Sequence, residues 1–205
     1  MSLPVMISHS LIHLGNQVAG VDEAGRGPLA GPVVVAAVIL PDGALLPGLN
    51  DSKKVSPKRR AALANLIKEC AIAWSVEIVP VHIIDSLNIL GATLWGMEQA
   101  VMKLSVAPAA VHIDGNKSPI LPYPTYTEIQ GDGRIACIAA ASILAKVTRD
   151  TLMEDLDQEY PMYGFFQHKG YPTAAHLKNL EEHGICPHHR LSFAPVKRLI
   201  GFSAQ

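Results

Sequence analysis

Cysteine is scarce in this chain of 205 residues, and the three that occur, Cys70, Cys137 and Cys186, are far apart. An odd number of cysteines without any Cys-x-x-Cys pair argues against a disulfide framework and against a zinc ribbon. Cys70 and Cys137 are therefore expected to be small core residues.

Long hydrophobic runs are also missing. No apolar stretch approaches the ~18 residues that a membrane-spanning helix needs, and the longest, residues 32–41, is better interpreted as a buried strand. The first 16 residues contain no basic segment typical of a secretory signal. These features predict a cytoplasmic protein without a membrane partner.

Charge of one sign does not dominate, because the formal net charge is −1. Charged residues make up 17% and hydrophobic residues 49%, which is enough apolar material for one folded domain. The charges are distributed unevenly along the sequence. Residues 52–60 hold five cations and no acid, and the chain from Tyr160 onward is also locally basic. Such surfaces can follow a phosphate backbone.

Apolar runs and turn signals predict a mixed α/β domain. We expect strands over 17–21, 33–40, 74–79, 110–113 and 125–129, with helices over 57–70, 81–88, 92–104 and 135–157. Further helices are expected over 173–183 and 195–200. The predicted organisation is a mixed β-sheet flanked by helices over 17–158, followed by a small helical C-terminal appendage over 159–205.

Four carboxylates, Asp22, Glu23, Asp114 and Asp132, each follow an apolar strand. Strand ends of one sheet can meet at one edge, so these acids can converge despite their separation in sequence. An all-oxygen ligand set suits Mg²⁺ or Mn²⁺ better than Zn²⁺, and two such ions would serve phosphodiester hydrolysis. Taken singly, Asp114 and Asp132 could equally belong to ordinary turns.

Five separated segments resemble the type 2 ribonuclease H family, ribonuclease HII. They are Val21–Gly31 (VDEAGRGPLAG), Leu49–Lys54 (LNDSKK), Ile113–Asn116 (IDGN), Ala140–Asp150 (AASILAKVTRD) and His168–Thr173 (HKGYPT), in the order typical of the family. Residues 1–16 have no counterpart in that pattern.

The resemblance implies an RNase H-like fold and an endoribonuclease that cleaves RNA in RNA–DNA hybrids and incises 5′ of single ribonucleotides in duplex DNA, leaving 5′-phosphate and 3′-hydroxyl ends. By motif, Asp22, Glu23, Asp114 and Asp132 match metal-binding catalytic acids. The remaining matches are to substrate-binding residues: Gly25, Arg26 and Gly27 to a loop that contacts the ribose 2′-hydroxyl, and Tyr171 to a tyrosine that stacks at the RNA–DNA junction.

Several of these residues have simpler interpretations. Arg26 could only fix its turn through an ion pair, and Tyr171 could only pack the C-terminal appendage onto the main domain. Lys53 could contact substrate phosphates, whereas Arg59 and Arg60 are expected on a solvated helix face. Lys146 and Arg149 share a helix face and could pair with nearby carboxylates or touch the substrate.

A second cluster, His183, Cys186, His188 and His189, has no spacing typical of a zinc finger, and we expect it on the surface of the C-terminal appendage. Two other functions remain open from the sequence: a catalytically silent nucleic-acid-binding module and a metal-dependent phosphohydrolase of small molecules. The favoured hypothesis is a monomeric endoribonuclease that uses Mn²⁺ or Mg²⁺.

Overall fold

A computed structural model describes residues 11–44 and 46–202 of the chain. Its centre is a five-stranded mixed sheet with the strand order β3-β2-β1-β4-β5. The strands are β1 (Val18–Ala24), β2 (Val33–Ile39), β3 (Ala73–Val79), β4 (Ala110–Asp114) and β5 (Thr125–Glu128). β1, β2 and β3 pair antiparallel, whereas β4 and β5 continue the sheet in parallel.

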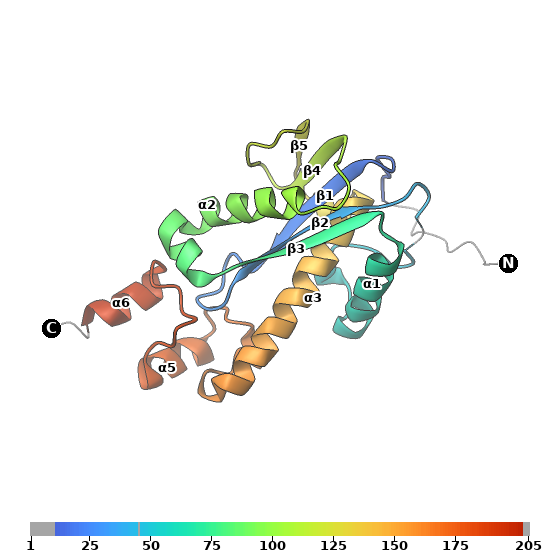
Figure 1. Ribbon diagram of the computed structural model, residues 1–205. Coiled ribbons are helices and arrows are strands. Elements are labelled where there is room, and N and C mark those ends of the chain that lie inside the picture. The colour runs from blue at the N-terminus through green and yellow to red at the C-terminus, as the bar shows by residue number, and fades with distance from the viewer. Residues whose placement is uncertain (1–10, 45, 203–205) are drawn as a thin grey trace.

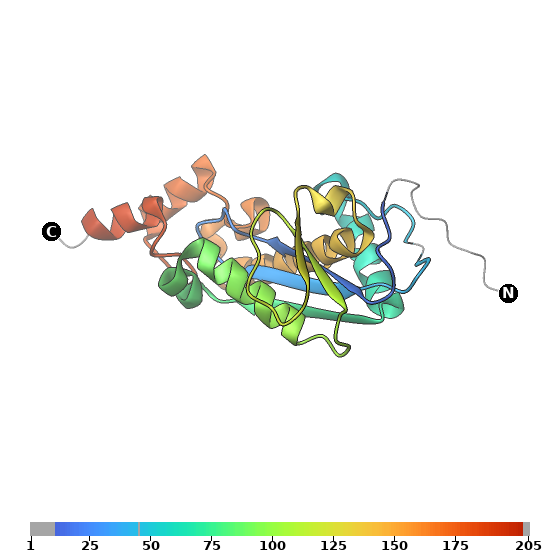
Figure 2. The same cartoon turned by 90° about the horizontal axis from the view of Figure 1, so that it is seen from above.

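Helices cover both faces of this sheet (Figures 1 and 2). The helices are α1 (Pro57–Cys70), α2 (Val81–Met102), α3 (Ala136–Glu159), α4 (Phe165–His168), α5 (Ala174–His183) and α6 (Ala194–Phe202). Side chains of β2 show the layering, because Val34, Ala36 and Val38 pack with α1 and α3 while Val35 and Ala37 pack with α2. The mixed α/β prediction is confirmed.

The close packing of α3 on β1 depends on Gly20. A Cβ atom at this position would overlap the backbone of Cys137 and Ile138 at the start of α3. Cys137 is buried there, and burial raises the pKa of its thiol to about 12, so it behaves as a small core residue as predicted. The contact brings the first turns of α3 directly beside the strand that carries Asp22 and Glu23.

The α2 segment consists of two helical parts that meet at a kink at Asn88, whose backbone has φ of 58°, so the two predicted helices are present without a longer loop between them. The Asn88 side-chain oxygen accepts hydrogen bonds from the amides of Leu90 and Gly91 at 3.0 and 3.1 Å, so it caps the second part of the helix. The sequence signalled the break correctly, but the connecting turn is shorter than expected.

The C-terminal appendage packs against the end of α3. Met153 and Leu156 of α3 share a small core with Tyr163, Phe165 and Cys186, and α5 and α6 lie beyond it (Figure 1). The division between 17–158 and 159–205 falls at the end of α3 and stays a prediction. At the other end, Ile12 forms a parallel bridge with Ile135, and residues 1–10 lie outside the described part of the chain. None of the described helices combines the length and the hydrophobicity of a membrane span.

Candidate active site

Asp22 and Glu23 lie inside β1, not beyond its end as the sequence predicted. The ladder with β2 continues through them, with Asp22 opposite Ala36 and Glu23 opposite Val35. On the other edge of β1, pairing with β4 stops at Val21. Asp22 and Glu23 therefore lie one and two residues past the last pair between β1 and β4, where β4 no longer pairs with β1.

The register of the parallel strands brings Asp114 beside Asp22. Val21 pairs with Ile113, so the next residue on each strand is a carboxylate. Asp132 comes from the 3₁₀ turn Gly131–Gly133, which follows β5. Carboxylate oxygens of Asp22, Asp114 and Asp132 all lie within 4.8 Å of one another. The predicted convergence of these three acids is present in the geometry.

Asp114 also shapes the turn that supplies Asp132. Its Oδ1 accepts a hydrogen bond from the Gly131 amide at 2.7 Å and a longer one from the Asp132 amide at 3.4 Å. A Cβ at Gly131 would lie 2.7 Å from Ile138 Cδ1, so glycine lets the turn fit beneath α3. Two acids far apart in sequence are thereby held in one rigid arrangement.

Glu23 stands next to this trio without belonging to it. Successive side chains of a strand point to opposite faces, and Glu23 lines a small cavity with Asp114, Gly115 and Arg26 on the α2 side. Its Oε1 pairs with Arg26 at 3.4 Å, while its Oε2 is buried and has no hydrogen-bond partner within the described residues. That bare oxygen is available for a cation.

Burial and mutual repulsion disturb the ionisation of these acids. Burial raises the pKa of Asp22 well above its ordinary value, and the neighbouring Glu23 and Asp114 raise it further. Burial raises the pKa of Glu23 despite the opposing charge of Arg26, and burial and then Asp114 raise the pKa of Asp132. Four like charges in one place require compensation by cations.

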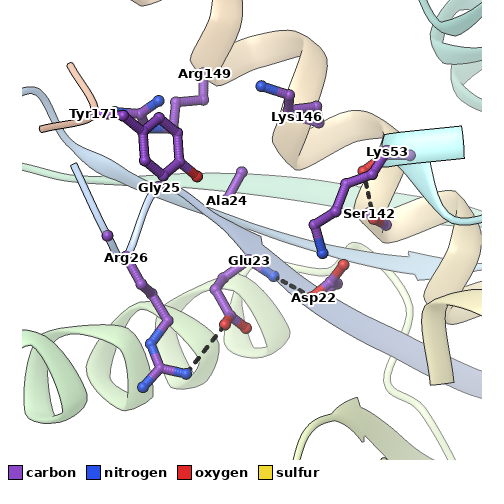
Figure 3. A pocket seen from close by; sticks show the side chains of 12 residues that line it. Asp22, Glu23, Ala24, Gly25, Arg26, Lys53, Ser142, Lys146, Arg149 and Tyr171 are labelled. Carbon is purple, nitrogen blue, oxygen red and sulfur yellow. Dashed lines mark hydrogen bonds and ion pairs between the residues drawn. The ribbon is translucent and has the colours of Figure 1, made fainter. Parts of the chain in front are cut away.

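One such cation is the Lys53 ammonium, which points toward Asp22 (Figure 3). Burial lowers the pKa of Lys53, but the surrounding carboxylates Asp51, Asp132 and Asp22 outweigh it and raise that pKa overall. Its short 3₁₀ turn, Ser52–Lys54, is tied to α3 by a 2.9 Å hydrogen bond from the Ser142 hydroxyl to the Ser52 hydroxyl.

Arg60 corrects a sequence expectation. It is buried instead of solvated, donates to the carbonyls of Ser52 and Val55 at 3.0 and 2.9 Å, and pairs with Asp150 at 3.2 Å. Its role is to hold the turn that carries Lys53. Lys146 also binds Asp150, at 2.5 Å, so structural pairing accounts for its position.

The loop after β1, Gly25–Gly31, rests on two buried arginines. Arg190, fully buried, donates to the carbonyls of Gly25, Arg26 and Gly31 at 2.6–3.0 Å. Arg149 donates to the carbonyls of Ala30, Pro32 and Lys169 at 3.0–3.3 Å. Burial lowers the pKa of Arg149 to about 10 and that of Arg190 to about 9.

Sequence reasoning missed Arg190 altogether and assigned Arg149 to carboxylates or substrate. Neither has a carboxylate among the hydrogen-bond partners given above; both bind backbone carbonyls. A periodicity-based analysis has no signal for an arginine that serves a distant loop, because the partner is backbone and any residue can provide it.

Tyr171 lies on the opposite side of the pocket from the acids (Figure 3). Its ring is 45% exposed, and a Cβ at Gly27 would lie 3.3 Å from Tyr171 Cε1, so the ring and the glycine loop are in contact range. An open pocket of about 290 Å³ extends between Asp22, Glu23, Lys53, the glycine loop and Tyr171. The site residues predicted from sequence surround this pocket, with Asp114 and Asp132 beside Asp22.

The cluster of His183, Cys186, His188 and His189 was predicted on the surface, and the structure contradicts this for Cys186 and His189. Cys186 and His189 are buried, whereas His183 is exposed and His188 half-buried. The described residues yield one candidate metal group, the trio of aspartates, and no cluster of histidine and cysteine ligands. The chemistry of the trio fits a hard divalent cation, because all donors are oxygens and the buried Oε2 of Glu23 adds a fourth.

Comparisons with known proteins identify the family and support the fold. The family model of ribonuclease HII matches residues 19–196. The structure is similar to ribonuclease H2 from Pyrococcus horikoshii OT3, with a TM-score of 0.80 and 26% identity over 92% of this chain and 99% of the other. RNase HII from Archaeoglobus fulgidus, solved in complex with PCNA, gives a TM-score of 0.71 and 26% identity, with coverage of 87% and 95%.

A more distant fold neighbour is Bst RNase HIII, solved with Mn²⁺, at 20% identity and a TM-score of 0.74 over 93% of this chain and 71% of the other. Fold and site together define a nuclease of the RNase H-like class. The family match covers most of the chain, and the protein belongs to the ribonuclease HII family. It is a ribonuclease H, a hydrolase that cleaves the RNA of RNA–DNA hybrids.

Proposed function

We propose that this ribonuclease H incises both RNA–DNA hybrids and duplex DNA that contains a single ribonucleotide, on the 5′ side of the ribonucleotide. The cluster of Asp22, Asp114 and Asp132 beside the Gly25–Gly27 loop is the observation that carries the proposal. It places a cation-binding centre next to a loop on which a sugar can lie. One chain provides all four acids, which supports action as a monomer.

Asp22, Glu23, Asp114 and Asp132 would hold two divalent ions, Mg²⁺ or Mn²⁺. The all-oxygen donor set, the bare Oε2 of Glu23 and the raised pKa of Asp22 support this assignment. When bound, such ions supply a water nucleophile at neutral pH and compensate the charge that develops on the leaving oxygen. Lys53 would balance the remaining negative charge as a substrate phosphate approaches the carboxylates.

The Gly25–Gly27 loop would read the ribose 2′-hydroxyl. Arg190 occupies the carbonyls of Gly25 and Arg26, and within the described residues nothing accepts a hydrogen bond from the amides of Arg26 and Gly27. Free amides on a rigid loop can bind the 2′-hydroxyl oxygen, the group that distinguishes RNA from DNA. Arg26 pairs with Glu23, so its side chain joins this loop to the acids.

Substrate choice and product ends test the proposal. With Mg²⁺ or Mn²⁺ we expect cleavage of a DNA duplex that carries one ribonucleotide, and no cleavage of the same duplex made entirely of DNA. The products should be a 3′-hydroxyl and a 5′-phosphate, identified by mass spectrometry and by ligation. A 2′,3′-cyclic phosphate would mean that the 2′-hydroxyl attacks, which contradicts hydrolysis by an added water.

Tyr171 is the second substrate-binding element, and its substitution provides another test. Tyr171→Ala should lower the cleavage rate at an isolated ribonucleotide by about 10²-fold, because misplacing the reacting phosphate by about 1 Å has an effect of that size. Tyr171→Phe should retain most activity, since stacking uses the ring. Tyr126→Ala, which removes an exposed tyrosine of β5, is the matched control. Wild-type rates for Tyr171→Ala would leave Tyr171 a packing residue only.

A further inference from the structure

Behind Tyr171 lies a chain of buried imidazoles that the proposed function does not use. His176 of α5 is fully buried, and its Nδ1 lies 2.9 Å from the carbonyl oxygen of Tyr171. His176 Nε2 lies 3.2 Å from Nε2 of His189, which is 1% exposed. His189 Nδ1 in turn lies 3.0 Å from the backbone amide of Cys186 and 3.2 Å from its sulfur.

These contacts determine which ring nitrogen of His176 and which of His189 carries a hydrogen. The Cys186 amide is a donor, so His189 Nδ1 must be a bare acceptor and His189 Nε2 must carry the hydrogen. That hydrogen is donated to His176 Nε2, which is therefore bare, and His176 Nδ1–H is left to donate to the Tyr171 carbonyl. Both rings are neutral, and each has one tautomer that satisfies its neighbours.

A third imidazole, His168, lies against His176, and its hydrogen-bond partners also define a single neutral tautomer. It stacks on His176 with ring centroids 4.4 Å apart, accepts from the Gly170 amide at Nδ1 (3.2 Å), and lies 2.8 Å from the Tyr163 carbonyl at Nε2. The Tyr171 amide donates to the His168 carbonyl at 2.9 Å. The Tyr171 carbonyl therefore contacts the His176 imidazole, whereas the Tyr171 amide contacts only the backbone of His168.

We infer that His176 is a positioning residue for Tyr171, and that His189 keeps His176 in the tautomer that holds the Tyr171 carbonyl. The inference rests on the proposed role of Tyr171 in binding the junction. The Tyr171 carbonyl is tied to the buried His176 imidazole, so the exposed Tyr171 ring is presented to the pocket from a fixed base.

Within residues 11–44 and 46–202, no carboxylate contacts either imidazole to stabilise a second proton. Burial is the main cause that lowers the pKa of His176, and burial and then His176 lower that of His189 to about 4. Burial raises the pKa of the Cys186 thiol, so the sulfur stays protonated beside His189. The titratable groups that face the two rings are His168, Tyr163, Cys186, His188 and, more remotely, His183 and Glu159.

Protonation of His189 makes the stability of the fold depend on pH. The folded pKa of His189 lies below the unfolded value of about 6.5, so the unfolded chain binds more protons between about pH 4 and 6.5. The stabilising arrangement is complete above pH 6.5 and is lost as the pH falls toward 4. Wild-type stability should rise with pH across this window, and His189→Gln, which cannot titrate, should show a smaller rise in chemical denaturation.

The proton positions can be measured without any reference to activity. Long-range ¹H–¹⁵N spectra of the full chain labelled with [¹⁵N]histidine should show His176 as the Nδ1–H tautomer and His189 and His168 as Nε2–H tautomers. Neither His176 nor His189 should take a second proton between pH 6 and 8. An Nε2–H tautomer for His176, or a doubly protonated ring at pH 7, would overturn the inference.

Kinetic measurements test whether His189 and His176 position Tyr171. His189→Phe keeps a ring but removes the donor, whereas His189→Gln can donate to His176 and accept from Cys186. On a duplex with one ribonucleotide we expect His189→Phe to lower kcat by about 10-fold with KM unchanged, through a displacement smaller than the 1 Å discussed for Tyr171. His189→Gln should restore most of kcat, and His82→Gln, an exposed histidine, is the control.

A double-mutant cycle separates this inference from the role of Tyr171 itself. If His189 acts through Tyr171, His189→Phe combined with Tyr171→Ala should be no slower than Tyr171→Ala alone. Additive losses, or equal rates for His189→Phe and His189→Gln, would overturn the inference while Tyr171→Ala remains slow. Wild-type rates for Tyr171→Ala would instead refute the proposed role of Tyr171, and the positioning inference with it. If His189→Phe does not fold, His189→Gln and the tautomer spectra still decide.

Discussion

Asp22→Asn is expected to abolish cleavage, lowering the rate by at least about 10³-fold, which corresponds to about 4 kcal/mol of transition-state stabilisation. A carboxylate oxygen of Asp22 lies within 4.8 Å of oxygens of both Asp114 and Asp132, and Asp22 precedes Glu23 in sequence. It is the residue best placed to contact both ions of the proposed pair. Asparagine keeps the shape of the side chain and removes the charge that holds a divalent cation.

The same substitution should not damage the fold. It removes one of several mutually repelling buried charges, so the metal-free variant should be at least as stable as the wild type in thermal unfolding. Mg²⁺ or Mn²⁺ should raise the melting temperature of the wild type more than that of Asp22→Asn, because only a ligand that binds the folded state stabilises it. Asp42→Asn, in an exposed turn, is the control. Cleavage at the wild-type rate by purified Asp22→Asn would contradict the assignment of the acids.

Gly25→Ala is expected to have the second large effect, on stability and on cleavage together. Gly25 has φ of +96°, and a Cβ there would overlap the Arg149 guanidinium. The substitution should cost about 2–5 kcal/mol in the free energy of unfolding, from backbone strain together with overpacking. It should lower cleavage at a single ribonucleotide by about 10²-fold, because the loop is displaced from the sugar.

Gly43→Ala separates the effect of backbone strain from the effect of overpacking against Arg149. Gly43 also has a positive φ, +67°, but a Cβ there would meet no atom of the described residues within 4 Å. It should cost about 1 kcal/mol of strain and leave cleavage unchanged. If denaturant titrations and rate measurements give the same values for both variants, the contact between the glycine loop and Arg149 does not matter for the site.

The sheet and the acids could be predicted because they follow from local patterns. The apolar run at 33–39 marks the central strand, and strong turn signals bound it. The end of β1 was placed too early, since two acids in a row break an apolar pattern. In the structure, the backbone of β2 continues to pair with β1 at Asp22 and Glu23, whose acidic side chains do not affect this pairing. Pairing between strands therefore outweighed the polar sequence, which alone indicates the end of a strand.

The residues that hold the active site in position could not be predicted in the same way. Arg149 and Arg190 bind carbonyls of residues more than 100 positions away, and His176 and His189 meet only because α5 folds back beside the chain after it. Nothing in the local sequence distinguishes a buried arginine from a solvated one, as Arg60 also shows. The chemistry of the site is visible in short motifs, whereas the groups that hold it in place depend on the complete fold.

The two buried arginines have a consequence for local opening. Arg190 lies in the segment after α5 and donates to the loop after β1, and the Arg190 amide also donates to the Leu29 carbonyl at 2.8 Å. Detaching that segment would leave several loop carbonyls without donors at once. We therefore expect the Gly25–Gly31 loop and the C-terminal segment to open as one cooperative unit, with their amides exchanging with solvent through the same event.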